Sequence, residues 1–242
     1  MTINIGICGA TGKMGRLLAI ESAKTPGIDN VYLYSRSIKG SSLSDLCISS
    51  DVVIDFSSES LLLALLEEGV KYDTKFVIGT TGINPTTYQS IIELAKTRAV
   101  LYSANMSFGI NILQKILFQF SNSLMNQNFD VEILDIHHKD KIDSPSGTSL
   151  MLGKEIAKSS NLQFEQVAIK RGEGKRMPGS IGFSSLRAGA IVGEHQIIFA
   201  NDDEEITISH KALTRDIFAK SAIKIALKIA NKTPGLYYLD NL

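Results

Sequence analysis

The 242-residue sequence has only two cysteines and no net charge, since 25 lysines and arginines balance 25 aspartates and glutamates. A balanced charge excludes the strongly basic surface that nucleic-acid-binding proteins use. The two cysteines, Cys8 and Cys47, supply neither a disulfide framework nor the ligand spacing of a zinc site. We therefore expect a protein of the reducing cytoplasm. Its expected partners are small molecules or copies of itself, and not nucleic acid.

Long hydrophobic runs are also missing. No apolar run approaches the roughly 18–20 residues that a membrane span needs. The first residues, MTINIGICGATG, lack a basic segment followed by a long apolar stretch, so we expect no signal peptide. Hydrophobic residues still make up 44% of the chain, which is typical of a globular protein with a core and no membrane contact.

The first half of the chain alternates short β-rich runs with segments of helical periodicity. Strands separated by helices predict right-handed βαβ crossovers, and therefore an α/β fold with a doubly wound parallel sheet. The predicted strands cover residues 3–8, 31–34, 51–55, 76–79 and 99–103, and the predicted helices cover residues 13–24, 58–70 and 84–97.

A change of pattern near residues 106–109 indicates a second domain. Two β-rich runs at 190–199 and 205–210, joined through Asn-Asp-Asp, predict a hairpin. The polar, glycine-bearing segment 171–182 is predicted to be a mobile loop. The remaining predicted elements are helices at 110–126, 146–159 and 215–232, and a strand at 131–136.

The segment GATGKMGR, residues 9–16, follows the first predicted strand and opens the first predicted helix. Glycines permit a tight turn, so that free N–H groups at the helix start can face a pyrophosphate. The spacing is not the commoner G-x-G-x-x-G, and a purely structural turn is the alternative. The position in the first βαβ unit favours nucleotide binding. The candidate residues are Gly9, Ala10, Thr11, Gly12, Lys13 and Met14.

The end of the second predicted strand bears on the choice of cofactor. An acidic residue usually stands there when the ribose 2′-hydroxyl is recognised, but this chain has Ser35 and Arg36. No carboxylate would repel a 2′-phosphate, and Arg36 could bind one. The sequence therefore predicts that NADPH is accepted at least as well as NADH. The alternative is that Arg36 is a solvated surface residue.

Three more loops follow the ends of predicted strands and should line the same crevice. Each alone is compatible with plain turn chemistry, but their joint position predicts contacts to the cofactor. The GTTG segment, residues 79–82, has small residues and hydroxyls that suit a ribose or a nicotinamide. The candidate residues in these loops are Phe56, Gly79, Thr80, Thr81, Ser103, Ala104, Asn105 and Met106.

The stretch HHKDKIDSPSGTS, residues 137–149, lies between a predicted strand and a predicted helix. Ser146 is expected to cap that helix. The N–H groups of Ser146, Gly147 and Thr148 should then point out of the helix end, where unpaired donors and partial positive charge suit a carboxylate. Gly147 would let such a ligand come close.

The same stretch holds half of the four histidines of the chain. Adjacent residues of an extended chain face opposite sides, so His137 and His138 need not have the same role. A histidine titrates near neutrality, and Lys141 could donate a proton while holding a carboxylate. Together with the helix end, these groups suit a small dianionic substrate that receives a proton.

The histidines allow three alternative interpretations. A metal site is disfavoured because no cysteine or second histidine pair stands at ligand spacing. A solvated loop is disfavoured by the adjoining PSGT turn, although Lys139 and Asp140 fit that reading. His195 and His210 lie in strand patterns and are expected to be structural, with a pocket-facing role as the alternative.

The sequence resembles the 4-hydroxy-tetrahydrodipicolinate reductase (dihydrodipicolinate reductase) family of the diaminopimelate route to lysine, over essentially the whole chain. The resemblance implies a Rossmann-like dinucleotide-binding domain at 1–106, a smaller α+β substrate-binding and tetramerisation domain with an open mixed sheet at 107–213, and a return to the first domain at 214–242. It also implies a homotetramer and a dicarboxylate substrate. The motifs that carry it are GATGKMGR, DVVIDFS, VIGTTG, SANMSFGIN, the E-x-x-x-x-HH-x-x-K-x-D-x-PSGT run that starts at Glu132, RAG, GEH and HKALTR.

The resemblance also implies roles for individual residues. His137 matches the family's proton donor or acceptor, and Lys141 matches its proton-donating lysine. His138 and the helix end at 146–148 match the residues that bind substrate carboxylates, and Arg215 stands where the family has an arginine near the substrate. No metal is implied.

The chain departs from the family pattern at Lys139, where arginine is common, at Ser35, which replaces an acidic residue, and at Met106, which replaces an aromatic one. The segment between Gly40 and Asp51 is short, so we expect the first domain to lack an element that some relatives have. Two rival functions stay open. They are an NADPH-binding regulator without chemistry and a related dicarboxylate dehydrogenase, which should have a catalytic cysteine in mid-chain.

Overall fold

The computed structural model describes residues 2–239 and 242. The chain forms two compact units. One contains the residues up to Ser107 and those from Asp216 onward, and the other contains Phe108–Arg215. Within the described ranges, no helix is long and apolar enough to cross a membrane.

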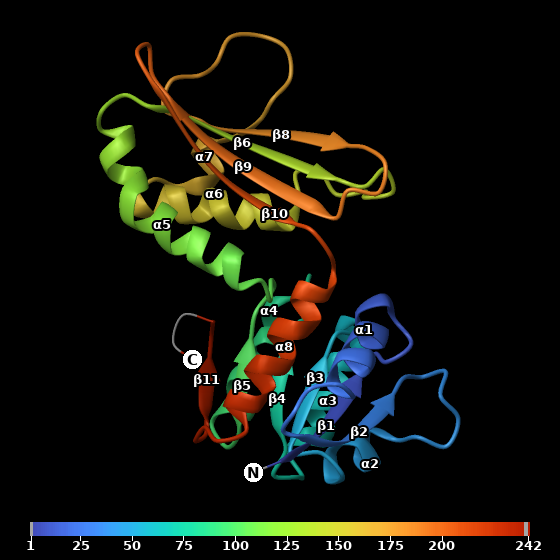
Figure 1. The fold of residues 1–242 in the computed structure, drawn as a ribbon. Helices are drawn as coiled ribbons and strands as arrows, with labels where there is room; N and C mark the ends of the chain where they lie inside the picture. Colours follow the sequence, from blue (N-terminus) through green and yellow to red (C-terminus); the bar gives the residue numbers. More distant parts are fainter. Residues whose placement is uncertain (1, 240–241) are drawn as a thin grey trace. The chain divides into compact units, whose positions relative to one another are not determined.

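The first unit is built on six strands that pair in parallel in the order β11-β5-β4-β3-β1-β2. This confirms the predicted doubly wound sheet. The chain runs outward from β1 to β2 and then returns to the other side of β1 with β3, so the order reverses between β1 and β3 (Figure 1). Ligands of such sheets bind at this reversal, beyond the carboxyl ends of the strands. The strands are β1 (Ile3–Cys8), β2 (Ile28–Tyr34), β3 (Val52–Asp55), β4 (Lys75–Ile78), β5 (Ala99–Tyr102) and β11 (Gly235–Tyr237).

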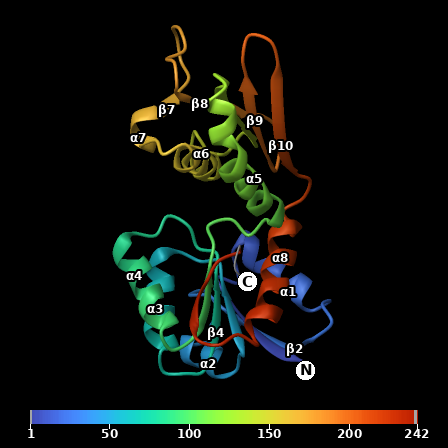
Figure 2. The ribbon, with the colours of Figure 1, turned by 90° about the vertical axis from the view of Figure 1, so that its left-hand side faces the viewer.

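Helices cover both faces of this sheet (Figure 2). Val52 and Ile54 face the core shared with α1 and α8, whereas Val53 faces the core shared with α2, α3 and α4. Because both faces are buried, β3 is a continuous apolar run and does not alternate with polar residues. The helices are α1 (Lys13–Ser22), α2 (Leu43–Ile48), α3 (Glu59–Gly69), α4 (Pro85–Ala95) and α8 (Asp216–Ile229).

Two elements of this unit were not expected from the sequence. The short helix α2 occupies part of the segment between Gly40 and Asp51, where the Ser42 side chain caps it by accepting from the Asp45 amide. Its six residues are too few to display a helical period. Strand β11 has only three residues and joins the sheet beside β5, which it reaches after α8.

The second unit is built on a five-stranded mixed sheet of order β10-β9-β6-β8-β7. Strands β9 and β10 form the predicted hairpin, and β6 pairs antiparallel with β9 but parallel with β8. Strands β7 and β8 and helix α7 were not predicted. The elements are α5 (Phe108–Met125), β6 (Asp130–His137), α6 (Gly147–Ser159), α7 (Phe164–Val167), β7 (Ala168–Lys170), β8 (Ile181–Arg187), β9 (Gly193–Ala200) and β10 (Glu205–Ala212).

Helices α5 and α6 both lie on one face of this second sheet (Figures 1 and 2). The core between them contains Val131 and Ile133 of β6, Phe183 of β8 and Ile197 of β9. Side chains two residues apart share a face of a strand. The same face of β6 therefore continues, after Ile133, with Asp135 and His137, and turns from apolar to polar where α6 begins.

Candidate functional site

A polar group lies at the carboxyl end of β6, on the face that α6 covers. Asp135 pairs in register with Ser185 of β8 and His195 of β9, so three neighbouring strands place these side chains in one row. The next row contains His137 and, in register on β8, Arg187. The pairing of β6 with β8 and β9 thus brings together residues that are about 50 to 60 positions apart in the sequence.

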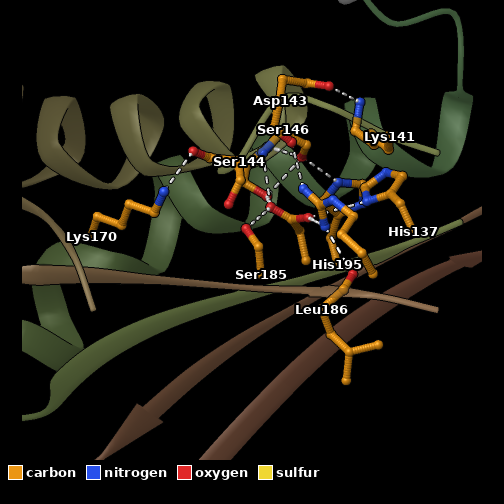
Figure 3. Close-up of polar contacts among 12 residues, drawn as sticks. His137, Lys141, Asp143, Ser144, Ser146, Lys170, Ser185, Leu186 and His195 are labelled. Atoms are coloured by element: carbon orange, nitrogen blue, oxygen red, sulfur yellow. Dashed lines mark hydrogen bonds and ion pairs between the residues drawn. The ribbon is translucent and has the colours of Figure 1, made fainter. Parts of the chain in front are cut away.

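Asp135 is fully buried, and both of its carboxylate oxygens accept hydrogen bonds. Oδ2 accepts from the Ser146 amide at 2.8 Å, from the Ser185 hydroxyl at 2.9 Å and from the Ser149 hydroxyl at 3.2 Å. Oδ1 accepts from Arg187 and lies 3.1 Å from Nδ1 of His137 (Figure 3). Burial alone would raise the pKa of Asp135, but the hydrogen bonds from His137, Ser146, Arg187 and Ser185 hold it well below its usual range. The group is therefore a buried carboxylate anion.

His137 and His195 lie against each other with their ring centroids 5.2 Å apart and their planes at 74°. Nε2 of His195 lies 3.1 Å from the Ser146 hydroxyl. Burial, followed by the charge of His137, lowers the pKa of His195 to about 4, so its ring is neutral at pH 7. His195 was expected to be structural from the sequence, yet it touches the candidate proton donor directly.

Lys141 follows the histidine pair in the loop between β6 and α6. Its Nζ lies 2.7 Å from Oδ1 of Asp143 (Figure 3). The Gly147 amide also donates to the Asp143 carboxylate. Burial opposes the effect, but these hydrogen bonds and the charge of Lys141 lower the pKa of Asp143. Asp143 thus holds two of the groups that were predicted to bind a substrate carboxylate.

The start of α6 confirms Ser146 as the N-cap, because its side chain accepts from the Ser149 amide. The three amides expected to point out of the helix do not behave alike. The Ser146 amide donates inward to Asp135, and Ser146 itself is only 2% exposed. Gly147 is exposed, and a Cβ built on it would meet no heavy atom within 4 Å. Gly147 is therefore the accessible residue of this helix end, and the half-buried Thr148 follows it.

The other two predicted substrate residues have no such network. His138 is half-buried, and its carbonyl accepts from the Lys141 amide, which closes a turn. Arg215 is half-buried and is the last residue of the second unit, directly before α8.

In the first unit, the predicted glycine turn lies at the reversal of strand order. Gly9 has a φ of +85°, and a Cβ there would come 2.5 Å from the Phe56 carbonyl oxygen of the neighbouring loop. A Cβ on Gly15 would come 2.2 Å from the Gly9 carbonyl oxygen, so this glycine lets α1 approach the turn. Gly12 is the N-cap of α1 and offers no side-chain cap. The first amides of α1 therefore have no side-chain acceptor, as a phosphate-binding turn requires.

A pocket with a volume of about 340 Å³ adjoins this turn. Ser35 and Ser37 are 2.8 Å apart through their hydroxyls, and Thr11 lies 3.2 Å from Ser35. The Arg36 guanidinium donates to the Ser60 hydroxyl at 3.1 Å. Of the described residues that line the pocket, none is acidic. They are Gly9, Thr11, Gly12, Ser35, Arg36, Ser37, Phe56, Ser57, Ser58 and Leu61.

The loops after β3 and β4 are joined by a second buried carboxyl group. Asp55 accepts from the hydroxyls of Ser57 and Thr80, each at 2.5 Å, and the Thr80 hydroxyl accepts from the Ser57 amide at 2.9 Å. The Thr80 side chain, although predicted to contact the cofactor, is therefore occupied inside the protein. The Phe56 ring lies on Gly79, because a Cβ there would come 2.4 Å from the ring.

The loop after β5 contains the last of the predicted cofactor residues. The Ser103 hydroxyl donates to the Asn105 carbonyl at 2.8 Å, which folds the loop back on itself. Met106 is 1% exposed and belongs to the core shared with α1 and α8. Ala104 is exposed.

Five residues of the polar group were not predicted in this role from the sequence: Asp135, Ser149, Ser185, Arg187 and His195. A signal for one of them was present, because Val131, Ile133, Asp135 and His137 follow a period of two. The partners from β8 could not be found in this way, since no strand was predicted there. Among the described residues, no group of three His, Cys, Asp or Glu side chains could hold a metal ion.

Comparison with known proteins agrees with the resemblance seen in the sequence. The family model "Dihydrodipicolinate reductase, N-terminus" matches residues 3–106, and "Dihydrodipicolinate reductase, C-terminus" matches residues 109–242. The chain is 43% identical over 239 residues to the 4-hydroxy-tetrahydrodipicolinate reductase of Rickettsia bellii, covering 98% of this chain and 93% of that protein. It is 41% identical over 243 residues to the enzyme of the same name from Rickettsia canadensis, covering 99% and 98%.

Among solved structures, the fold is similar to a dipicolinate-bound dihydrodipicolinate reductase from Paenisporosarcina. The TM-score is 0.77 at 21% identity, and 98% of each chain is covered. The two family models together span nearly the whole chain, and the relatives exceed 40% identity over almost their full length. The chain belongs to the dihydrodipicolinate reductase family.

Proposed function

We propose that this protein reduces 4-hydroxy-tetrahydrodipicolinate to tetrahydrodipicolinate with NADPH or NADH, in the diaminopimelate route to lysine. The observation that carries the proposal is the arrangement in the second unit. There, the end of β6 with His137, the following loop with Lys141 and the exposed start of α6 combine proton donors with carboxylate-binding groups. Family membership supports the substrate, since the relatives are named for this reaction.

The first unit suits a nicotinamide dinucleotide. The cradle formed by Gly9 and Gly12 leaves no side chain between a pyrophosphate and the first amides of α1. Lys13 and Met14 begin the helix behind it. The loops that contain Phe56, Gly79 and residues 103–106 follow neighbouring strands of the same sheet, and we assign them to the ribose and nicotinamide side.

The cofactor, when bound, supplies a hydride. The ring carbon of the substrate that carries the 4-hydroxyl gains this hydride, and the hydroxyl leaves as water after it takes up a proton. We assign the proton transfer to His137 and Lys141, because an imidazole and an ammonium group can each donate an N–H proton to a substrate held beside them. One substrate molecule, one reduced cofactor and one proton thus give tetrahydrodipicolinate, oxidised cofactor and water.

The second unit would hold the substrate through its two carboxylates. One is assigned to the amides of Gly147 and Thr148 and to Lys141, where it would take the place of the Asp143 carboxylate. The other is assigned to His138 and to Arg215, which is the last residue of the second unit. Fixing both ends of a rigid ring orients the reacting carbon and removes part of the entropic barrier.

We assign the adenosine 2′-phosphate of NADPH to Thr11, Ser35, Arg36 and Ser37. These residues offer three hydroxyls and a guanidinium at the end of β2, with no acidic residue beside them among the described lining residues. A 2′-phosphate could accept from all four, whereas the ribose hydroxyl of NADH lacks the usual carboxylate partner.

We further infer a homotetramer, located in the cytoplasm. Both α5 and α6 lie on one face of the second sheet, and residues of its other face, such as Leu134, Ile136 and Ile198, are half-buried. That face is available for contact between copies. Light scattering on the purified protein should give a mass near four times the 26.4 kDa of the chain, and a monomeric mass would contradict the assembly.

The deciding experiment is an assay coupled to the enzyme that makes 4-hydroxy-tetrahydrodipicolinate. The absorbance of NADPH or NADH should fall only when that coupled product is present. A protein that binds NADPH but never oxidises it would instead be a regulator. A related dehydrogenase would instead oxidise the cofactor with a different dicarboxylate or semialdehyde. The expected catalytic cysteine of such an enzyme has no counterpart here, because Cys8 and Cys47 are both buried in the first unit.

A further inference from the structure

We propose that Asp135 is a positioning residue that fixes the tautomer of His137, so that Nε2 of His137 is the atom that exchanges a proton with the substrate. This deepens the proposed reduction and rests on it. Neither the sequence motifs nor the roles implied by the family resemblance assign a function to Asp135.

The two ring nitrogens of His137 are not equivalent. Nδ1 of His137 lies 3.1 Å from Oδ1 of Asp135. A carboxylate can only accept, so this contact requires a proton on Nδ1. The neutral ring then has its lone pair on Nε2, and the charged ring donates from Nε2. The contact therefore selects one of two tautomers, as carboxylates paired with histidines do in other sites.

The Asp135 carboxylate is held in one orientation by its hydrogen bonds. The buried carboxylate is held as an anion by Arg187, and its other oxygen is saturated by Ser146, Ser149 and Ser185. Oδ1 is thus the only oxygen that faces the His137 ring. An anion that cannot rotate away gives the ring a fixed orientation as well as a fixed tautomer.

The His137 imidazole has charged and titratable neighbours from several elements. The charged or titratable groups around it are Asp135 on its own strand, Arg187 on β8, His195 on β9 and Lys141 in the following loop. His195 is neutral at pH 7 and contacts the ring in an edge geometry. His195 therefore packs against the His137 ring and carries no charge that would compete with Asp135.

The edge of the His137 ring that contains Nε2 faces Gly193. A Cβ built on Gly193 would lie 3.1 Å from Nε2 of His137, and every heavy atom it would meet within 4 Å belongs to that ring. Glycine at this position therefore leaves space at Nε2. Its φ lies outside the positive range that disfavours side chains, so alanine is compatible with the backbone.

Asp135 also connects the imidazole to the carboxylate-binding helix end. The same side chain accepts from the Ser146 amide, which directly precedes Gly147. Tautomer, ring position and the start of α6 are thus set by one buried carboxylate. This explains why the motif spaces the histidine from the PSGT turn, since both must reach Asp135.

The direct test is the nitrogen chemical shifts of the histidine rings in ¹⁵N-histidine-labelled protein. The chain has four histidines, and the His137 signals can be assigned by comparison with His137→Gln. At a pH where the ring is neutral, the wild-type protein should show a proton on Nδ1 and none on Nε2. Asp135→Asn should shift His137 toward a mixture or toward the other tautomer. An unchanged Nδ1–H tautomer in folded Asp135→Asn would overturn the proposal.

Turnover gives the second readout. Asp135→Asn should lower kcat on the order of 10²-fold or more, the scale of a misplaced acid–base histidine, while KM for the cofactor stays within about twofold. The matched variant Ser185→Ala removes a hydrogen bond from the other oxygen of Asp135. It should keep the wild-type tautomer and lose much less turnover. Equal losses of kcat in both variants would mean that Asp135 acts only through general stability.

Gly193→Ala tests the same idea without changing any charge. The added methyl group should displace the ring by a few tenths of an ångström and lower kcat roughly tenfold, given the sensitivity of reactions to sub-ångström misplacement. Wild-type kcat in this variant would overturn the assignment of Nε2, even if Asp135→Asn fails to fold. If the wild-type protein shows no turnover at all, the proposed function fails, whereas the nitrogen shifts still decide the role of Asp135.

Discussion

Asp55 and Asp135 are both fully buried carboxyl groups near the carboxyl ends of strands, one in each unit. Asp55 receives hydrogen bonds from the hydroxyls of Ser57 and Thr80. Asp135 receives them from a backbone amide, two hydroxyls, an imidazole and the Arg187 guanidinium. Burial raises the pKa of Asp55, since its hydroxyl partners do not offset the loss of water. Burial also acts on Asp135, but there the partners prevail and the pKa falls.

The difference shows that burial alone does not set the state of a carboxyl group. A buried carboxyl group with hydroxyl partners can join two loops, as Asp55 does in the first unit. An anion with an arginine partner can orient an imidazole, as Asp135 does in the second. In the proposed function, the first unit binds its ligand mainly with backbone amides, whereas the second uses charged side chains held in register by three strands.

The largest expected effect is on stability, and it tests this contrast directly. Asp135→Asn leaves Arg187 without its buried counter-charge, so it should lower the free energy of unfolding by about 3–5 kcal/mol. Asp55→Asn removes a carboxyl group whose charged form burial already disfavours, so it should cost only about 1 kcal/mol. Urea unfolding of both variants provides the measurement. Similar losses in the two would contradict the contrast.

Acid should destabilise the second unit through His195. Its pKa in the folded protein, about 4, lies below the ordinary 6.5. As the pH falls, the unfolded chain takes up the proton first, so stability is complete above pH 6.5 and is lost between pH 6.5 and 4. The loss from this group is about 3 kcal/mol. His195→Gln should flatten that part of the unfolding curve measured against pH, while His138→Gln should not.

Lys141→Ala should lower kcat on the order of 10²-fold or more, because it removes a group assigned to proton transfer. Binding of NADPH, which we assign to the first unit, should remain as in the wild-type protein when measured by fluorescence titration. Lys139→Ala is the matched control, since Lys139 is exposed in the same loop. Wild-type turnover in Lys141→Ala would exclude the assigned role.

The smallest expected effect separates the two cofactors in the first unit. Arg36→Ala should raise KM for NADPH about tenfold, the scale of one charge-assisted hydrogen bond. KM for NADH should change little, because NADH lacks the 2′-phosphate. Steady-state rates with both cofactors give the answer. A strong preference of the wild-type protein for NADH would contradict the assignment to Arg36.

Local sequence signals predicted most of the first unit. The run from β1 through the glycine turn into α1 lies in one continuous segment, and five of the six strands of the sheet were visible as β-rich runs. Cys8 is buried within β1, as its surroundings predicted. The six-residue helix α2 and the three-residue strand β11 were missed because they are shorter than the periods used to detect them.

The site in the second unit was only half visible in the sequence. His137, Lys141 and the Ser146 cap stand close together in one motif, and the cap prediction is confirmed. Two partners of Asp135, Ser185 and Arg187, come from β8, and His195 lies in register with Asp135 on β9, about 50 to 60 residues further along the chain. Their approach depends on the pairing of distant strands, and no local pattern encodes that register.

The Asp143 carboxylate, which pairs with Lys141 and accepts from the Gly147 amide, affects how salt should change substrate binding. If a substrate carboxylate takes these partners, one anion replaces another, and the local charge of the loop changes less than the charge of the ligand implies. Ionic strength should then weaken substrate binding only modestly. A loop that carries its own counter-ion need not attract one from solution before the substrate arrives.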